Sequence, residues 1–282
     1  MEFLSAFLHH GFLRNALAAG LLAAVGCGLI GPFVVVRRIS SLTGAIAHAV
    51  LGGMGIALYF GGPPLAGAIV AAVGAALLIG WIGLVRKERE DALIGAIWAT
   101  GMAVGIVFIA KTPGYDTELL SYLFGSILMV DSSQLWGMVV LDAVIAAAVV
   151  LLYRPFVAVS FDEELARLRG LPVVALQLLL LVLVSLTVVL LIRVAGLVLV
   201  LALLTLPSAA AGHWARSLAG MMAVATLLGG VAAAGGLWIS YAPDLPAGAT
   251  IVLVAAALFL ASLALRALGD RVVSRGRGPG PK

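Results

Sequence analysis

Long apolar runs, repeated along the whole chain, constrain this sequence more than any other feature. A helix needs about 20 residues to cross the hydrocarbon core of a bilayer, and nine runs of about that length follow one another here. Short polar, charged or Gly/Pro-rich segments separate them. The predicted spans are 13–36, 42–60, 65–85, 92–110, 135–153, 172–192, 195–211, 218–238 and 247–267. The sequence therefore predicts an all-α, polytopic membrane protein with about nine transmembrane helices.

Composition excludes the main alternative classes of protein. Apolar residues make up 63% of the 282 residues and charged residues only 11%, whereas a soluble domain has about 25% charged residues. A soluble enzyme, a disulfide-rich secreted domain and a disordered chain are therefore excluded. Cys27 is the one cysteine, so no internal disulfide can form. A further apolar stretch, 119–130, is too short to span and is predicted to be re-entrant or interfacial.

The basic residues indicate how the spans are oriented. With nine alternating spans, all but three of the 17 Lys and Arg residues fall on one side, the exceptions being Arg14, Lys111 and Arg193. The positive-inside rule makes that side cytoplasmic and leaves the N-terminus outside. The charge thus reflects membrane topology and not a nucleic-acid partner. The bias toward Ala, Gly, Leu and Arg is typical of a prokaryotic source, so we expect a multi-pass protein of a bacterial or archaeal cell membrane. We expect a membrane domain over 1–270 and a disordered, basic cytoplasmic tail over 271–282.

One cytoplasmic segment, 160–172, is predicted to form a short helix with well-defined ends. Ser160 is the expected N-cap, with Glu163 at the capping-box position. The acidic residues Asp162, Glu163 and Glu164 favour the positive start of this helix. Gly170 is suited to the C′ position, and the proline at 172 stops the helix.

Two leucines of this predicted helix, Leu165 and Leu168, are spaced i and i+3 and share one face. Two interpretations stay open for the segment. It is either a solvated connector between two spans, or a docking helix whose leucine face enters a groove on a cytoplasmic partner.

Ionisable residues inside spans are candidates for function, because they are costly to bury in a bilayer. His48 lies in the second span among small residues, and its imidazole suits a divalent transition metal as well as a structural hydrogen bond. Asp142 lies inside the fifth span. Asp244 lies at the outer end of the eighth span, between Pro243 and Pro246. Two interpretations stay open for it, a metal contact and a turn residue. We treat His48, Asp142 and Asp244 as the candidate metal ligands.

Nucleotide-hydrolysis and metal-hydrolase motifs are missing from the sequence. It contains neither a G-x-x-x-x-G-K-[ST] string nor an H-E-x-x-H string. We therefore expect no enzymatic activity of this chain itself, and no permanently bound cofactor. If it drives transport, the energy comes from an ion gradient or from ATP on a partner subunit.

Five strings, in the order of the predicted topology, carry a resemblance to a known family. They are GPFVVVRRIS (31–40), AHA (47–49), FDEELARLRGLP (161–172), RVAG through LPSAA (193–210) and DLPAGA (244–249). Together they resemble the membrane permease subunit of the zinc/manganese/iron family of bacterial ABC importers, from about residue 12 to residue 266.

The resemblance implies a set of partners and a role for the cytoplasmic helix. Two permease copies would pair around a translocation path, with two separate ATP-binding subunits on the cytoplasmic side. An extracytoplasmic metal-binding protein would deliver the ion. The segment 160–170 would be the coupling helix, with Asp162, Glu163, Glu164, Leu165, Leu168 and Gly170 as its contact residues.

The resemblance also implies a metal site in the second span. In the family, a histidine with an aspartate four residues before it forms an intramembrane site, and His48 matches that histidine. The fourth residue before it is Gly44, so the carboxylate of the i, i+4 pair is missing. The remaining contacts would come from elsewhere, such as Asp142, or the ion would be bound very weakly, which conduction tolerates.

Two other functions stay open at this point. A permease for a metal chelate has a similar topology, although such permeases are usually longer. A stand-alone secondary transporter would show inverted repeats and paired charges at the middle of the membrane, and neither is evident in the sequence.

Overall fold

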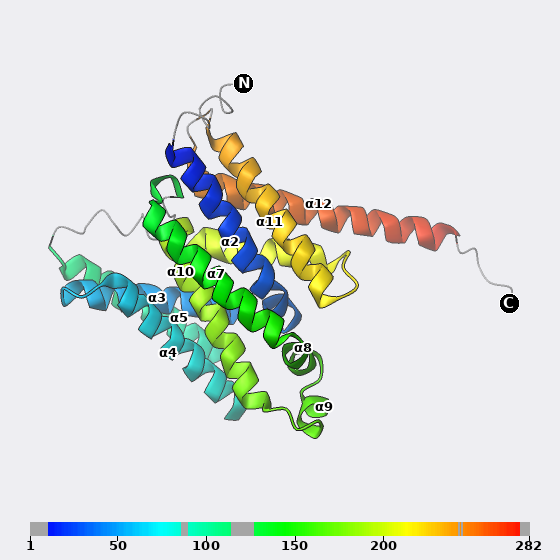
Figure 1. The fold of residues 1–282 in the computed structure, drawn as a ribbon, viewed down its shortest axis with the longest axis horizontal. Coiled ribbons are helices and arrows are strands. Elements are labelled where there is room, and N and C mark those ends of the chain that lie inside the picture. Colours follow the sequence, from blue (N-terminus) through cyan, green and yellow to red (C-terminus); the bar gives the residue numbers. More distant parts are fainter. Residues whose placement is uncertain (1–10, 86–89, 114–126, 242, 244, 277–282) are drawn as a thin grey trace.

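The computed structural model describes residues 11–85, 90–113, 127–241, 243 and 245–276, and this part of the chain is helical with no strand. Figure 1 shows the helices packed as a bundle, with α12 extending away from it. The elements are α2 (Gly11–Val36), α3 (Ser40–Tyr59), α4 (Pro64–Val85), α5 (Glu90–Lys111), η2 (Ile127–Met129), α7 (Ser132–Leu151), α8 (Tyr153–Phe161), α9 (Glu163–Leu168), α10 (Val173–Gly212), α11 (Leu218–Tyr241) and α12 (Ala247–Gly276).

The predicted fold class is confirmed, and the number of spans is approximate. Among the described residues, seven helices are long and apolar enough to cross a membrane: α2, α3, α4, α5, α7, α11 and α12. The two other predicted spans correspond to shorter apolar helices, Val173–Val189 and Gly196–Gly212. Both lie within α10. The chain is therefore a multi-pass, all-α membrane protein.

A break at Gly196 divides α10 into two helices. Gly196 has φ 72° and ψ 164°, a conformation that side chains with a Cβ rarely adopt. The chain changes direction there, so the second half of α10 leaves the line of the first half (Figure 1). The predicted boundary between the sixth and seventh spans, at 192–195, lies beside this glycine. A long apolar segment thus becomes two shorter ones because one residue without a side chain permits the turn.

Small residues allow the helices to approach closely. A Cβ on Gly52 would lie 2.9 Å from the carbonyl oxygen of Gly101, and one on Gly55 would lie 2.8 Å from that of Gly105. The backbones of α3 and α5 are therefore in contact, which is how helices in a membrane gain van der Waals energy. The sequence holds the glycines for this packing in two short patterns, GGMG at 52–55 and GMAVG at 101–105. It holds His48 of α3 directly against α5.

Two predicted segments, the tail 271–282 and the short apolar stretch 119–130, are described only in part by the structure. Helix α12 continues to Gly276, six residues into the segment predicted to be a disordered tail, and 277–282 lie outside the described residues. The short apolar stretch 119–130 lies mostly outside the described residues as well. Its last part forms η2, whose Ile127 is buried against the bundle.

Candidate functional site

His48 lies in the closely packed interface between α3 and α5. Its side chain is 6% exposed and stacks on the indole of Trp98, with ring centroids 4.5 Å apart and planes inclined by 29°. The Nδ1 atom is buried and has no hydrogen-bond partner among the described residues. Buried polar atoms are nearly always paired. An unpaired imidazole nitrogen is also the atom that binds transition metals, so a metal contact of His48 stays a prediction.

Gly44, four residues before His48, lies against the indole of Trp98. A Cβ on Gly44 would lie 2.4 Å from Cζ3 and 2.9 Å from Cη2 of Trp98. The indole therefore occupies the volume that a side chain at residue 44 would need. Only glycine at this position lets Trp98 lie over the imidazole of His48. Trp98 was not identified from the sequence, because 50 residues separate it from His48.

Asp142 occupies a different part of the bundle. It lies on α7, and its Oδ2 atom is buried without a hydrogen-bond partner among the described residues. The other oxygen, Oδ1, lies 2.6 Å from the position of a Cβ on Gly26 of α2, and Thr187 of α10 borders the same place. Asp142 therefore faces α2 and α10, whereas His48 faces α5. The structure does not show Asp142 supplying the ligand that is missing beside His48.

The three predicted ligands do not form a cluster in the described part of the chain. No group of three or more His, Cys, Asp or Glu side chains that could hold a metal ion occurs among the described residues. Asp244 itself lies outside them. The assignment of His48, Asp142 and Asp244 to an ion path therefore stays a prediction.

The predicted cytoplasmic helix is present as α9, but it begins two residues later than expected. Asp162 is the N-cap, and its side chain accepts a hydrogen bond from the backbone N–H of Leu165 at 2.9 Å. The prediction of Ser160 as N-cap was wrong, because α8 continues through Phe161 and includes Ser160. Glu163 is consequently the first residue of the helix and does not form a capping box.

The C-terminal end of α9 is formed as predicted. Gly170 has φ 76°, and its N–H donates to the carbonyl of Arg167 at 2.9 Å. The N–H of Leu171 donates to the carbonyl of Ala166 at 3.1 Å. These two bonds make a Schellman motif. A helix of six residues is thus closed at both ends by its own local hydrogen bonds.

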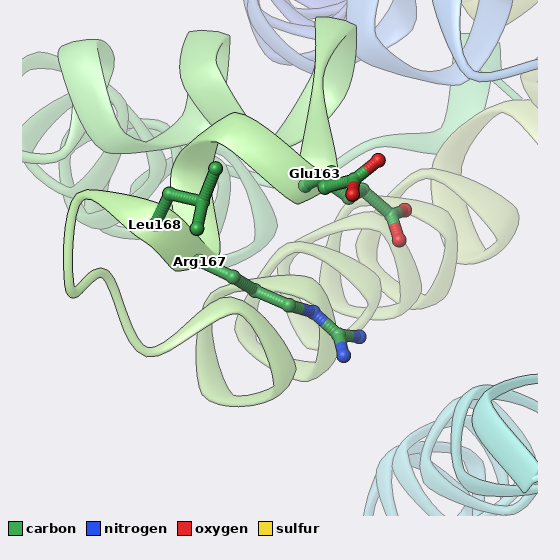
Figure 2. Close-up of a pocket in the computed structure, with 4 residues that line it drawn as sticks. Glu163, Arg167 and Leu168 are labelled. Carbon is green, nitrogen blue, oxygen red and sulfur yellow. The ribbon is translucent and has the colours of Figure 1, made fainter.

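The outer face of α9 is exposed at the edge of the protein. Leu168 is 81% exposed and Leu165 is 43% exposed. Leu168, Arg167, Glu164 and Glu163 line an open groove of about 590 Å³. Figure 2 shows Leu168 at one end of this groove and Glu163 at the other, with the Arg167 side chain extending along it. An apolar tip with charges beside it suits a protein partner.

The inner side of α9 is attached to the membrane helices through Glu163. Its Oε1 atom accepts a hydrogen bond from Nη2 of Arg37 at 3.1 Å, and a second one from Nε2 of Gln177. Arg37 directly follows α2, and Gln177 lies in the first turns of α10. From the sequence, Glu163 is expected on the contact surface with a partner. The structure shows that its carboxylate is engaged within the chain, whereas Glu164 lies exposed.

The comparisons with known proteins cover nearly the whole chain. Residues 9–266 match the ABC 3 transport family. An uncharacterised membrane protein of Synechocystis is 46% identical over 92% of both chains. The manganese transport system membrane protein MntC of Halalkalibacterium halodurans is 35% identical over 91% of this chain and 88% of its own.

A solved structure confirms the fold. PsaBC from Streptococcus pneumoniae, determined in complex with a Fab, superposes with a TM-score of 0.85 at 33% sequence identity, over 93% of this chain and 94% of the matched chain. This chain belongs to the ABC 3 transport family, as the resemblance in its sequence motifs predicted.

Proposed function

We propose that this chain is the membrane permease of an ATP-driven importer for divalent transition-metal ions, with manganese or zinc as its substrate. The MntC protein of Halalkalibacterium halodurans, 35% identical over 91% of this chain, is named as a manganese transport protein. That name supports manganese as a transported ion. A separate ATP-binding subunit supplies the energy, since the chain has no Walker A motif. An extracytoplasmic metal-binding protein delivers the ion, and a second permease copy completes the path.

The observation that carries this proposal is the exposed tip of α9. The six-residue helix, closed by Asp162 and by the Gly170 turn, buries only Ala166 against the bundle. Its Leu168 side chain is nevertheless 81% exposed to the predicted cytoplasm. A leucine held in this way on a rigid support is typical of a side chain that enters a partner's groove. We propose the ATP-binding subunit as that partner.

The attachment of α9 suggests how the partner drives transport. When the ATP-binding subunits close, they move α9, and Glu163 passes that movement to the end of α2 and the start of α10. Helix α10 can bend at Gly196, where the backbone already departs from the helix. The path then opens outward, and hydrolysis returns it to the inward state. His48 and Asp142 are the proposed contacts of the ion along this path, with Asp244 at the outer entrance.

Uptake by the reconstituted complex tests the proposal. The chain is placed in proteoliposomes with its ATP-binding and metal-binding partners, and uptake of Mn²⁺ and Zn²⁺ is measured with and without ATP. We expect ATP-dependent uptake that Leu168→Glu abolishes while insertion into the membrane is unchanged. Leu168→Met, which keeps an apolar tip of similar size, is the matched control and should transport normally.

Each alternative function gives a different result in this assay. Uptake without ATP or the ATP-binding subunit would identify a secondary transporter and contradict the proposal. Wild-type uptake by Leu168→Glu would contradict the docking role of α9. Loss of uptake in His48→Ala, with ATP hydrolysis preserved, would support a place for His48 on the ion path, and unchanged uptake would make His48 a packing residue.

A further inference from the structure

We infer that the inner end of α12 and the loop between α10 and α11 bind the phosphate headgroups of anionic phospholipids, through Arg216 and Arg266. The proposed transport function uses neither arginine. The inference needs only the membrane topology predicted from the basic residues, in which the C-terminal end of α12 is cytoplasmic. It concerns the boundary between the bilayer and the cytoplasm, away from the proposed ion path.

Helix α12 leaves the bundle at Ser262. This serine is 7% exposed and is the last buried residue of α12 among those whose side chains are described. Residues 263–268 are all exposed, and Figure 1 shows the C-terminal part of α12 extending away from the other helices. The inner end of α12 is therefore covered by something other than the described part of this chain.

Apolar side chains surround this part of α12 on all sides. Four exposed leucines lie there, at positions 260, 263, 265 and 268. With about 3.6 residues per turn, these positions fall on different sides of the helix. A groove on a protein covers one face of a helix, whereas hydrocarbon surrounds it. The apolar span of α12 ends at Leu268, so the helix passes out of the bilayer at that level.

A hydrogen bond holds the α10–α11 loop, residues 213–217, beside α12. The Nε1 atom of Trp214 donates to Oγ of Ser262 at 2.8 Å, while the Trp214 side chain stays 54% exposed. An indole with its N–H bound and its ring exposed is typical of the interface between bilayer and water. The indole and the end of the apolar span therefore mark the same region as the inner interface.

Two arginines lie close to this hydrogen bond. Arg216 follows Trp214 by two residues, and Arg266 follows Ser262 by one helical turn toward the predicted cytoplasm. Both arginines are exposed, and neither has an ion-pair or hydrogen-bond partner among the described residues. Guanidinium groups bind phosphate oxygens through paired N–H donors. Two of them at headgroup level are therefore suited to a lipid phosphate.

The charge of the C-terminal part of the sequence favours the same partner. From residue 247 to the end, the chain has five basic residues, of which Arg266 is the first, and one acidic residue, Asp270. Basic residues that directly follow a membrane helix on the cytoplasmic side are attracted to anionic lipids. An acidic protein surface would meet the same charge, but it would not cover leucines on every side of α12. The apolar surface and the charge together favour a lipid.

Thermal unfolding of the full-length permease in nanodiscs tests this inference. The nanodiscs contain either phosphatidylcholine alone or phosphatidylcholine mixed with phosphatidylglycerol. We expect phosphatidylglycerol to raise the unfolding temperature of the wild type by about 4 °C. The double variant Arg216→Gln/Arg266→Gln should lose most of that increase. In phosphatidylcholine alone it should unfold like the wild type, because neither arginine has a partner within the described chain.

Arg169→Gln is the matched control. Arg169 is also exposed on the predicted cytoplasmic side, but it lies at the end of α9, so this variant should keep the full response to phosphatidylglycerol. Glycerol phosphate in solution is the probe for a free phosphate. It should not raise the unfolding temperature in phosphatidylcholine nanodiscs, because only a lipid places its phosphate at the interface.

Three results would overturn the inference. The first is an equal response of the wild type and the double variant to phosphatidylglycerol, and the second is an increase with soluble glycerol phosphate. The third is a double variant that keeps its lipid response but binds the ATP-binding subunit more weakly, which would assign the arginines to a protein contact. None of these measurements depends on transport, so a complex that takes up no metal contradicts the proposed function and leaves this inference to its own test.

Discussion

The guanidinium of Arg37 donates a hydrogen bond to the Oε1 atom of Glu163 across 3.1 Å, and the two residues are 126 positions apart in the chain. This ion pair connects the end of α2 with the first residue of α9. Gln177 donates to the same oxygen from α10. The helix that carries the exposed Leu168 is therefore held at its other side by the end of α2 and by α10.

The Glu163 contacts predict a loss of coupling when the carboxylate is changed. Glu163→Ala removes the acceptor for both Arg37 and Gln177, so α9 then acts on α2 and α10 only through the connecting chain and its remaining contacts. We expect ATP hydrolysis by the complex to continue while metal uptake per ATP falls at least about fivefold. Glu163→Gln is the matched control, because its amide oxygen can still accept from Arg37 and Gln177, and its ratio of uptake to hydrolysis should stay closer to wild type. Equal ratios for the two variants would contradict a transmitting role.

The N-terminal end of α9 predicts different results for substitutions at Asp162 and at Ser160. Asp162→Ala removes the N-cap and should destabilise α9 by about 1 kcal/mol. Ser160→Ala removes a buried hydroxyl without a hydrogen-bond partner among the described residues, so it should be neutral or slightly stabilising. Hydrogen exchange of the amides of 163–168 measures the difference. Faster exchange in Ser160→Ala than in Asp162→Ala would restore the sequence-based assignment of the cap.

The break in α10 predicts a penalty for any side chain at residue 196. Gly196→Ala forces a Cβ into a conformation with φ 72° and should cost about 1–3 kcal/mol. Thermal unfolding of the purified permease should show this loss. Gly74→Ala provides the comparison, because a Cβ on Gly74 meets nothing within 4 Å and its φ is not positive. A continuous, equally stable helix in Gly196→Ala would show that the break is not required by the fold.

The hydroxyl of Ser262, within α12, predicts a further stability effect. Ser262 Oγ accepts a hydrogen bond from Nε1 of Trp214 at 2.8 Å and shares another with Nδ1 of His213 at 2.9 Å. Ser262→Ala leaves these ring nitrogens without that partner and should destabilise the protein by about 1–3 kcal/mol. Thermal unfolding checks the size of the effect. An unchanged unfolding temperature would contradict a stabilising role for this contact.

The sequence by itself determined the features that depend on local chemistry. Hydropathy over about 20 residues specifies a membrane helix whatever its neighbours are, so the all-α, multi-pass class followed directly. The Gly170 terminus of α9 was predictable for the same reason, since a Schellman motif uses only adjacent residues. Family motifs such as FDEELARLRGLP (161–172) also need no structure to be recognised.

Only the tertiary structure decided which of these residues meet. The ring of Trp98 lies over Gly44 and His48, and Glu163 turns inward to Arg37, because α3 packs on α5 and α9 packs beside α2 and α10. Such pairs are 50 or more positions apart, and hydropathy does not encode which faces of apolar helices come together. In a membrane, lipid and helix are equally apolar, so packing shape and a few polar contacts select the arrangement. The local pattern specified the helices, and the close approach of their small residues specified the site.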